Sequence, residues 1–167
     1  MTRGLDALDV SLIELFTVEP RIGVLEASRR LGVARGTVQA RLDRLDRDGV
    51  ISSWAPTVDP ASLGYAVTAF LTLEIRQDVG HQQVAQHLVQ IPEVIEAYTI
   101  TGTGDLWCRC VARSNSDLQR VIDLVGAFEP IVRTSTVIAL ATQVSHRTGP
   151  LLAAQAAGPA TPGPART

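Results

Sequence analysis

One segment, residues 22–51, constrains the fold more than any other part of this 167-residue chain. It predicts two short amphipathic helices that flank a tight turn and are followed by a return strand. Apolar residues recur at i, i+4 and i+7 counted from Val38, which gives the second predicted helix one apolar stripe. Gly32 is typical of the residue that ends a helix. The segment therefore predicts a helix-turn-helix running from Val24 to Asp43.

The polar face of the second predicted helix carries the candidate DNA-binding residues. A short helix that is polar outward, rich in arginine and braced by another helix suits the major groove of DNA. The residues expected to reach DNA are Arg35, Thr37, Gln39, Arg41 and Arg44. We expect Arg35, at the helix start, to point into the groove, and Arg41 and Arg44 to meet phosphates. The same spacing also occurs in ordinary helical cores with a solvated arginine face, so spacing alone leaves both interpretations open.

The overall charge does not indicate a broad basic surface. The chain has 15 basic and 17 acidic residues and a net charge of −2, and all of its basic residues are arginine. Any DNA contact must therefore come from locally placed arginines. No apolar run approaches the roughly 18 residues of a membrane span, and the N-terminus carries no secretory signal. We expect a cytoplasmic protein without a membrane partner.

The second half of the chain has the pattern of a small mixed domain. Runs rich in β-branched and alternating apolar residues predict strands at residues 67–76, 94–101, 106–112 and 131–144. Apolar residues at helical spacing predict helices at residues 80–91 and 117–128. The order β-α-β-β-α-β is the ferredoxin-like arrangement. Because both helices would cover one sheet face, the other face needs a partner, and we expect at least a homodimer.

The predicted architecture is an α+β chain with four segments. A winged helix-turn-helix DNA-binding domain takes residues 1–57. Its wing has a strand at residues 50–54 after the turn at Asp48 and Gly49, and residues 55–59 carry either a second strand or a linker. Residues 58–65 form a linker, and residues 66–146 form the ferredoxin-like effector-binding and oligomerisation domain. Residues 147–167 are rich in Pro, Gly, Ala and Thr, which predicts a disordered tail in which residues 151–157 can form a transient turn of helix.

Nothing in the sequence predicts a metal site, a cofactor or catalysis. Cys108 and Cys110 lie two apart in a predicted strand, where they would share one face and pack as small apolar residues. Asp105 has no neighbouring His, Ser or Cys in an arrangement for acid–base or nucleophilic chemistry. No metal-ligand spacing connects the three histidines, which are His81, His87 and His146.

Five short motifs stand in a distinctive order along both halves. They are LDALDVSLIELF at residues 5–16, the run at 21–51, Val58-Asp59 before Leu63-Gly64, VIEAYTITGTGD at 94–105, and RTSTVI at 133–138. In this order and spacing, residues 5–144 resemble the Lrp/AsnC family of transcription regulators. The resemblance implies an amino-acid-responsive regulator that binds double-stranded DNA, dimerises through its C-terminal domain and often forms octamers.

The resemblance also implies a small effector, an amino acid, bound between dimers near the turn at residues 102–105. The effector-binding residues it implies are Gly102, Thr103, Gly104, Asp105, Thr134 and Thr136. Without the resemblance, the turn is more simply a β-turn between two strands, where Gly and Asp are favoured. Its chemistry suits an amino acid, because glycine N–H groups can hold a carboxylate and Asp105 can pair with an ammonium group.

The chain departs from the family pattern at the start of the second helix, where Ala34 stands in place of the usual serine cap. An amino-acid-sensing module that has lost DNA binding is therefore an alternative. A small enzyme on a ferredoxin-like scaffold is a more distant one. The intact apolar frame of both helices favours the DNA-binding regulator, because a decayed module should have lost it.

Overall fold

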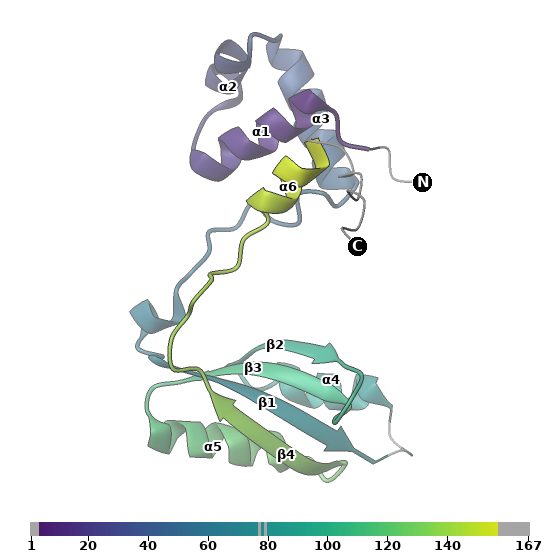
Figure 1. Ribbon diagram of the computed structural model, residues 1–167, viewed down its shortest axis with the longest axis vertical. Helices are drawn as coiled ribbons and strands as arrows, with labels where there is room; N and C mark the ends of the chain where they lie inside the picture. The colour runs from purple at the N-terminus through teal and green to yellow at the C-terminus, as the bar shows by residue number, and fades with distance from the viewer. Residues whose placement is uncertain (1–3, 77, 79, 157–167) are drawn as a thin grey trace, which may run out of the picture. The chain divides into compact units, whose positions relative to one another are not determined.

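The computed structural model describes residues 4–76, 78 and 80–156. The chain divides into two compact units (Figure 1). One unit comprises the described residues up to Pro56 together with those from Val144 onward, and the other comprises Thr57–Gln143. Within the described ranges, no helix has the length and apolar character needed to cross a membrane.

The first unit is built on the predicted helix-turn-helix. Its helices are α1 (Ala7–Val18), α2 (Val24–Leu31) and α3 (Arg35–Arg47). Their apolar sides meet in a core around Leu12, Ala27, Val38 and Leu42. The turn between α2 and α3 depends on Gly32, which has a φ of 65°, a conformation that favours glycine.

The predicted wing is wrong in its secondary structure, because residues 50–59 form no strand. The N–H groups of Val50 and Ile51 instead bond the carbonyl of Leu45 at the end of α3, so they are not available to a hairpin ladder. Trp54 packs edge-on against Phe16 of α1, with the ring centroids 5.6 Å apart. The segment after α3 thus closes the three-helix core as an irregular chain.

The predicted disordered tail contains a packed helix where the sequence predicts only a transient turn of helix. Residues Gly149–Ala156 form helix α6, which packs against α1 of the first unit. Composition favours disorder here, but a helix gains stability from packing that composition does not report. Residues 157–167, the rest of the predicted tail, lie outside the described residues.

The second unit has the predicted β-α-β-β-α-β order. Its elements are a short 3₁₀ turn η1 (Pro60–Leu63), β1 (Val67–Ile75), α4 (His81–Val89), β2 (Val94–Thr99), β3 (Leu106–Ala112), α5 (Asn115–Gly126) and β4 (Ile131–Ile138). The strands form one antiparallel sheet in the order β2-β3-β1-β4. Both helices cover the same face of that sheet (Figure 1). The α+β class with a ferredoxin-like second domain is confirmed.

Several boundaries differ from prediction by a few residues, and two of these differences have a clear physical reason. The last strand ends at Ile138, which pairs with Ala69 near the start of β1, and the ladder ends one residue later, where the Ala139 N–H donates to the Thr68 carbonyl. Helix α5 begins two residues earlier than expected, because Ser114 caps it by accepting a hydrogen bond from the N–H of Asp117.

Candidate DNA-binding helix and effector turn

Helix α3 presents three of the five candidate DNA-binding side chains to solvent. Arg35, Thr37 and Gln39 are exposed, while the apolar stripe that begins at Val38 is buried. Arg35 occupies the first position of the helix, as expected. Gln39 donates from Nε2 to Asp43 Oδ1 at 2.8 Å, a bond one turn along the helix surface. The helix start has no side-chain cap, because Ala34 occupies the N-cap position.

The other two candidates, Arg41 and Arg44, are held by carboxylates at the start of α1. Arg41 Nη1 donates to both carboxylate oxygens of Asp6 at 2.6 Å and to Asp9 Oδ1 at 2.8 Å. Arg44 Nη2 lies 2.5 Å from the same Asp9 oxygen. Sequence periodicity places the two arginines on α3, but it does not reveal partners more than thirty positions away in the chain. The structure therefore shows them anchoring α3 to α1.

The same contacts shift the acidity of both carboxyl groups. The Arg41 guanidinium, with the N–H of Asp9, lowers the pKa of Asp6 from 3.8 to about 2. Burial of Asp9 acts to raise its pKa, but the hydrogen bonds from the Asp6 N–H, Arg41 and Arg44 outweigh burial, so the pKa is lowered. Both groups are therefore carboxylates at neutral pH.

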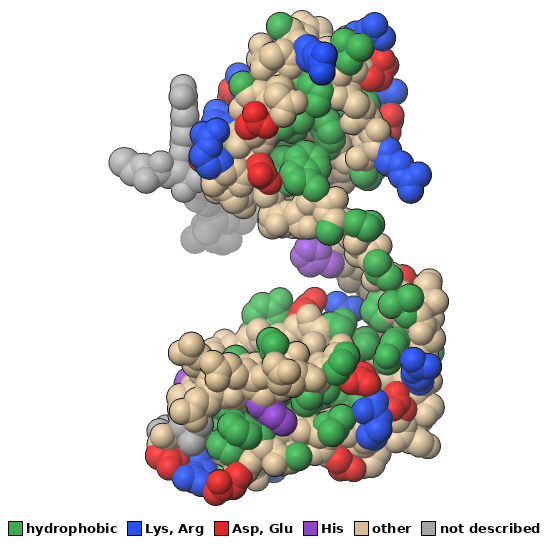
Figure 2. Space-filling model, turned by 180° about the vertical axis from the view of Figure 1, so that it is seen from behind, with side chains coloured by type: hydrophobic (Ala, Val, Ile, Leu, Met, Phe, Trp, Pro, Cys, Tyr) green, Lys and Arg blue, Asp and Glu red, His purple; other side chains and the backbone are tan. Residues whose placement is uncertain are grey.

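Arg47 is an exposed arginine on α3 that the candidate set left out. In the described part of the chain, neither Arg35 nor Arg47 lies within ion-pairing distance of a carboxylate. The helical period places Arg47 opposite the buried stripe, so the sequence contained the signal. Basic and acidic side chains alternate over the face of the first unit seen in Figure 2, without one continuous basic patch.

The candidate effector turn, residues 102–105, is tightly constrained by the sheet. Gly102 has a φ of 110°, which other residues rarely adopt. A Cβ on Gly104 would lie 2.4 Å from Thr72 Cγ2 and 3.2 Å from the Leu73 carbonyl oxygen. Both glycines thus have structural roles that are independent of any ligand.

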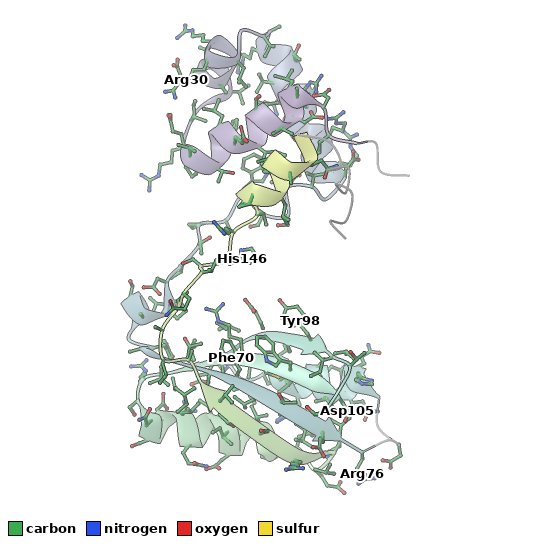
Figure 3. The ribbon with its side chains drawn as sticks, viewed as in Figure 1. Arg30, Phe70, Arg76, Tyr98, Asp105 and His146 are labelled. Carbon is green, nitrogen blue, oxygen red and sulfur yellow. The ribbon has the colours of Figure 1, made fainter. Side chains whose placement is uncertain are left out.

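Asp105 connects this turn to the end of β1. Its N–H donates to the Leu73 carbonyl at 2.9 Å, and its carboxylate Oδ2 accepts from the N–H of Ile75 at 2.8 Å. The Ile75 N–H lies where the register between β1 and β4 shifts. Asp105 therefore supplies an acceptor at an irregularity in the sheet. Figure 3 shows it at the same end of the sheet as Arg76.

The two candidate threonines of β4 lie on the core side of the sheet. Thr134 is paired with Leu73 and Thr136 with Leu71, and both leucines are fully buried beneath the helices. Residues paired directly across two strands share a face. Both threonines are accordingly half-buried.

Gly104, by contrast, approaches the uncovered face, because it meets the side chain of Thr72. Within one subunit, the structure therefore does not bring the turn and the two threonines together. Ser135, which pairs with Thr72, and Arg133, which pairs with Glu74, are exposed polar side chains of β4 on the side of the turn. The alternation of side chains along a strand already indicates that Ser135 lies on the opposite face from Thr134 and Thr136.

The uncovered sheet face carries a cluster of aromatic side chains. Phe70 stacks on Trp107 with the ring centroids 5.0 Å apart, and Tyr98 lies 5.9 Å from Trp107. Figure 3 shows Phe70 and Tyr98 on the side of the sheet away from the helices. Val137, paired with Phe70 on β4, extends this apolar surface and is largely exposed.

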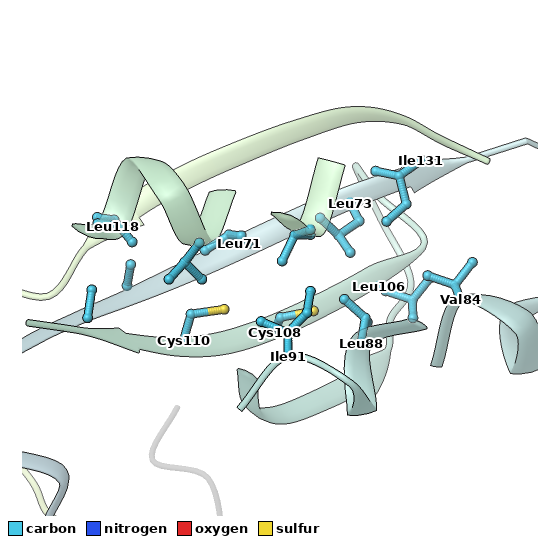
Figure 4. Packing of buried hydrophobic residues seen from close by; sticks show 14 of the residues in the cluster. Leu71, Leu73, Val84, Leu88, Ile91, Leu106, Cys108, Cys110, Leu118 and Ile131 are labelled. Atoms are coloured by element: carbon cyan, nitrogen blue, oxygen red, sulfur yellow. The ribbon is translucent and has the colours of Figure 1, made fainter. Parts of the chain in front are cut away.

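The two cysteines are buried on the helix-covered face, as predicted, and are free thiols (Figure 4). Burial raises the pKa of Cys108 to about 11 and that of Cys110 to about 12, so neither is a reactive thiolate. Among the residues that the structure describes, no group of three His, Cys, Asp or Glu side chains could hold a metal ion.

Two protein-family models match this chain, one over most of the first unit's helices and one over most of the second unit. Residues 5–46 match the AsnC-type helix-turn-helix domain, and residues 68–148 match the Lrp/AsnC ligand binding domain. The HTH-type transcriptional regulator FL11 of Pyrococcus furiosus is 32% identical over 136 residues, which cover 81% of this chain and 89% of the relative. This chain belongs to the Lrp/AsnC family. It is a transcriptional regulator with a helix-turn-helix DNA-binding domain and a ligand-binding domain.

Solved structures of this Lrp/AsnC fold agree with the architecture of the chain. Escherichia coli AsnC is similar with a TM-score of 0.81 and 26% identity, covering 89% of this chain and 100% of that one. A feast or famine regulatory protein from M. tuberculosis, complexed with L-methionine, has a TM-score of 0.77 and 23% identity over 87% of this chain and 98% of that one. The comparisons give no support to the alternative of a module that has lost DNA binding.

Proposed function

We propose that this Lrp/AsnC regulator reads duplex DNA with α3 and responds to an amino acid bound by its second unit. One observation carries the DNA part of the proposal. Helix α3 presents Arg35, Thr37 and Gln39 to solvent on a helix whose opposite side is fixed in the core. In this motif the start of the second helix enters the major groove. We further propose that the chain acts in the cytoplasm and catalyses no reaction.

The proposed effector contacts are the backbone of Gly102, Thr103 and Gly104 and the carboxylate of Asp105. The second oxygen of Asp105 has no partner among the described residues, and the residue is half-buried rather than enclosed. An α-ammonium group can pair with such an oxygen. A similar fold from M. tuberculosis holds L-methionine, which supports the amino-acid class of ligand.

Thr134 and Thr136 can join the same site only across subunits. The two threonines lie on the core side of the sheet, whereas the turn lies toward the uncovered face. One effector can therefore contact both the threonines and the turn only where a second subunit supplies one of these two groups of residues. We therefore propose a site between dimers of a homo-oligomer. The dimer itself would form by pairing of two uncovered aromatic faces, and dimers would associate further, up to an octamer.

DNA binding is tested first by selecting duplexes from a random-sequence library with the full-length protein. Arg35→Ala and Gln39→Ala should each weaken binding to the selected duplex about tenfold or more, because a base contact is worth roughly 1–3 kcal/mol. Arg113→Ala, which removes an exposed arginine from the second unit, is the charge-matched control. Equal binding by all three variants would contradict the assignment of α3.

The effector is tested by calorimetry with each common amino acid. Asp105→Asn is the informative variant, because an amide oxygen can still accept the Ile75 N–H while the charge is lost. The expected result is that the binding amino acid loses about tenfold or more in affinity. Asp123→Asn, on the surface of α5, is the control. A ligand that binds Asp105→Asn as tightly as wild type would remove Asp105 from the site.

A further inference from the structure

Four charged side chains meet where the start of α1 contacts α3. Asp9 is the most unusual of them, because it has an exposure of 0% although it is ionised. It lies in a capping box, in which Asp6 N–H donates to Asp9 Oδ2 and Asp9 N–H donates to Asp6 Oδ1. The backbone at the start of α1 therefore holds both carboxylates in place independently of their contacts with α3.

The carboxylates engage only part of each guanidinium. Arg41 uses Nη1 for all of its bonds to Asp6 and Asp9, and Arg44 uses Nη2 for Asp9. A guanidinium has further N–H donors in the same plane. The side chains of Arg41 and Arg44 remain 26% and 28% exposed. Each arginine thus keeps N–H donors that these carboxylates do not use, on a partly exposed side chain whose direction the carboxylates fix.

We propose that Asp9, supported by Asp6, is a positioning residue for DNA binding, which aims Arg41 and Arg44 at the phosphate backbone and sets the rotation of α3. The inference rests on the proposed function. The buried stripe of α3 holds the helix against the core, but apolar contacts are non-directional. Ion pairs with several fixed partners restrict rotation and side-chain direction, and an arginine oriented in advance loses less freedom on meeting a phosphate.

This proposal predicts an effect opposite in sign to simple electrostatics. Removing a negative charge from a DNA-binding unit should strengthen DNA binding by reducing repulsion. If Asp9 positions the arginines, its neutralisation should instead weaken binding. Asp48 serves as the matched control, because it is an exposed acid at the end of α3 that accepts no side-chain hydrogen bond in the described part of the chain.

The experiment measures binding of the full-length protein to the selected duplex and to a scrambled duplex, over a series of salt concentrations. Asp9→Asn should weaken binding to the selected duplex about tenfold or more and reduce its preference over the scrambled one. The slope of log affinity against log salt should fall by about 1 to 2, as expected for the loss of one or two phosphate contacts. Asp48→Asn should bind as wild type or more tightly, with an unchanged slope.

Asp6→Asn keeps the proposal testable if Asp9→Asn does not fold, which thermal unfolding will show. An asparagine at position 6 can still accept the Asp9 N–H, but it loses the ion pair with Arg41. For Asp6→Asn, the slope of log affinity against log salt should fall by about 1. Unchanged or tighter binding by a folded Asp9→Asn, or an unchanged slope in Asp6→Asn, overturns the inference. A wild-type protein that selects no sequence overturns the proposed function itself.

Discussion

At the scale of single residues, the close approach of β1 requires a glycine at position 104. We expect Gly104→Ala to lower the free energy of unfolding of the second unit by about 1–3 kcal/mol, because its Cβ would overlap Thr72. Denaturant unfolding followed by Trp107 fluorescence in a Trp54→Phe background measures this unit separately, since the chain has two tryptophans. Gly126→Ala, in the open last turn of α5, is the control and should be neutral or slightly stabilising. Equal effects of the two substitutions would contradict the packing argument.

Asp6 makes the stability of the first unit depend on pH. Its pKa is lowered to about 2 in the folded state, so its contribution is complete above about pH 4 and is lost as the pH falls toward 2. Asp6→Asn should therefore melt at a lower temperature than wild type at pH 7, and the difference should narrow toward pH 2. Thermal unfolding at a series of pH values tests this. A difference that stayed constant with pH, as expected for Asp48→Asn, would argue against the ion pair with Arg41.

At the scale of elements, the N-terminus of α3 lacks the side-chain cap that stabilises the N-terminus of α5. Ser114 caps α5 through its hydroxyl, whereas Ala34 offers α3 no side-chain acceptor. The backbone of Ala34 is already extended, with a ψ of 144°, so a serine there needs no rearrangement. Ala34→Ser should raise the free energy of unfolding of the first unit by about 1 kcal/mol. Ala40→Ser, in the exposed middle of the same helix, should instead lower the free energy of unfolding by about 0.5 kcal/mol. An increase in this free energy for both variants would refute a capping effect.

At the scale of the whole molecule, the uncovered sheet face should hold two subunits together. Val137→Arg places a charge beside Phe70 on that face and should convert the protein to monomers at micromolar concentration, because the charge would be desolvated in the interface. Light scattering after size-exclusion chromatography gives the mass directly. Val89→Arg introduces the same charge on the outer surface of α4 and should leave the dimer intact. A Val137→Arg protein with the mass of wild type would exclude this face as the dimer interface.

The sequence by itself determined the local features of both units. The spacing of Val38, Leu42 and Leu45 predicted the buried side of α3, and the alternation around Cys108 and Cys110 predicted their common buried face. Both follow from a side-chain period that belongs to one helix or one strand. The order of strands and helices then limited the second unit to the ferredoxin-like arrangement.

Only the tertiary structure decided which distant groups meet. It placed Arg41 and Arg44 on the carboxylates of α1, and it put Thr134 on the side of the sheet away from Gly104. It also replaced the expected wing by an irregular segment and part of the expected tail by α6. The physical reason is the same in each case. A local pattern reports which side of an element is apolar, but the partner of a charge, an N–H group or a strand edge is set by packing between segments far apart in the chain.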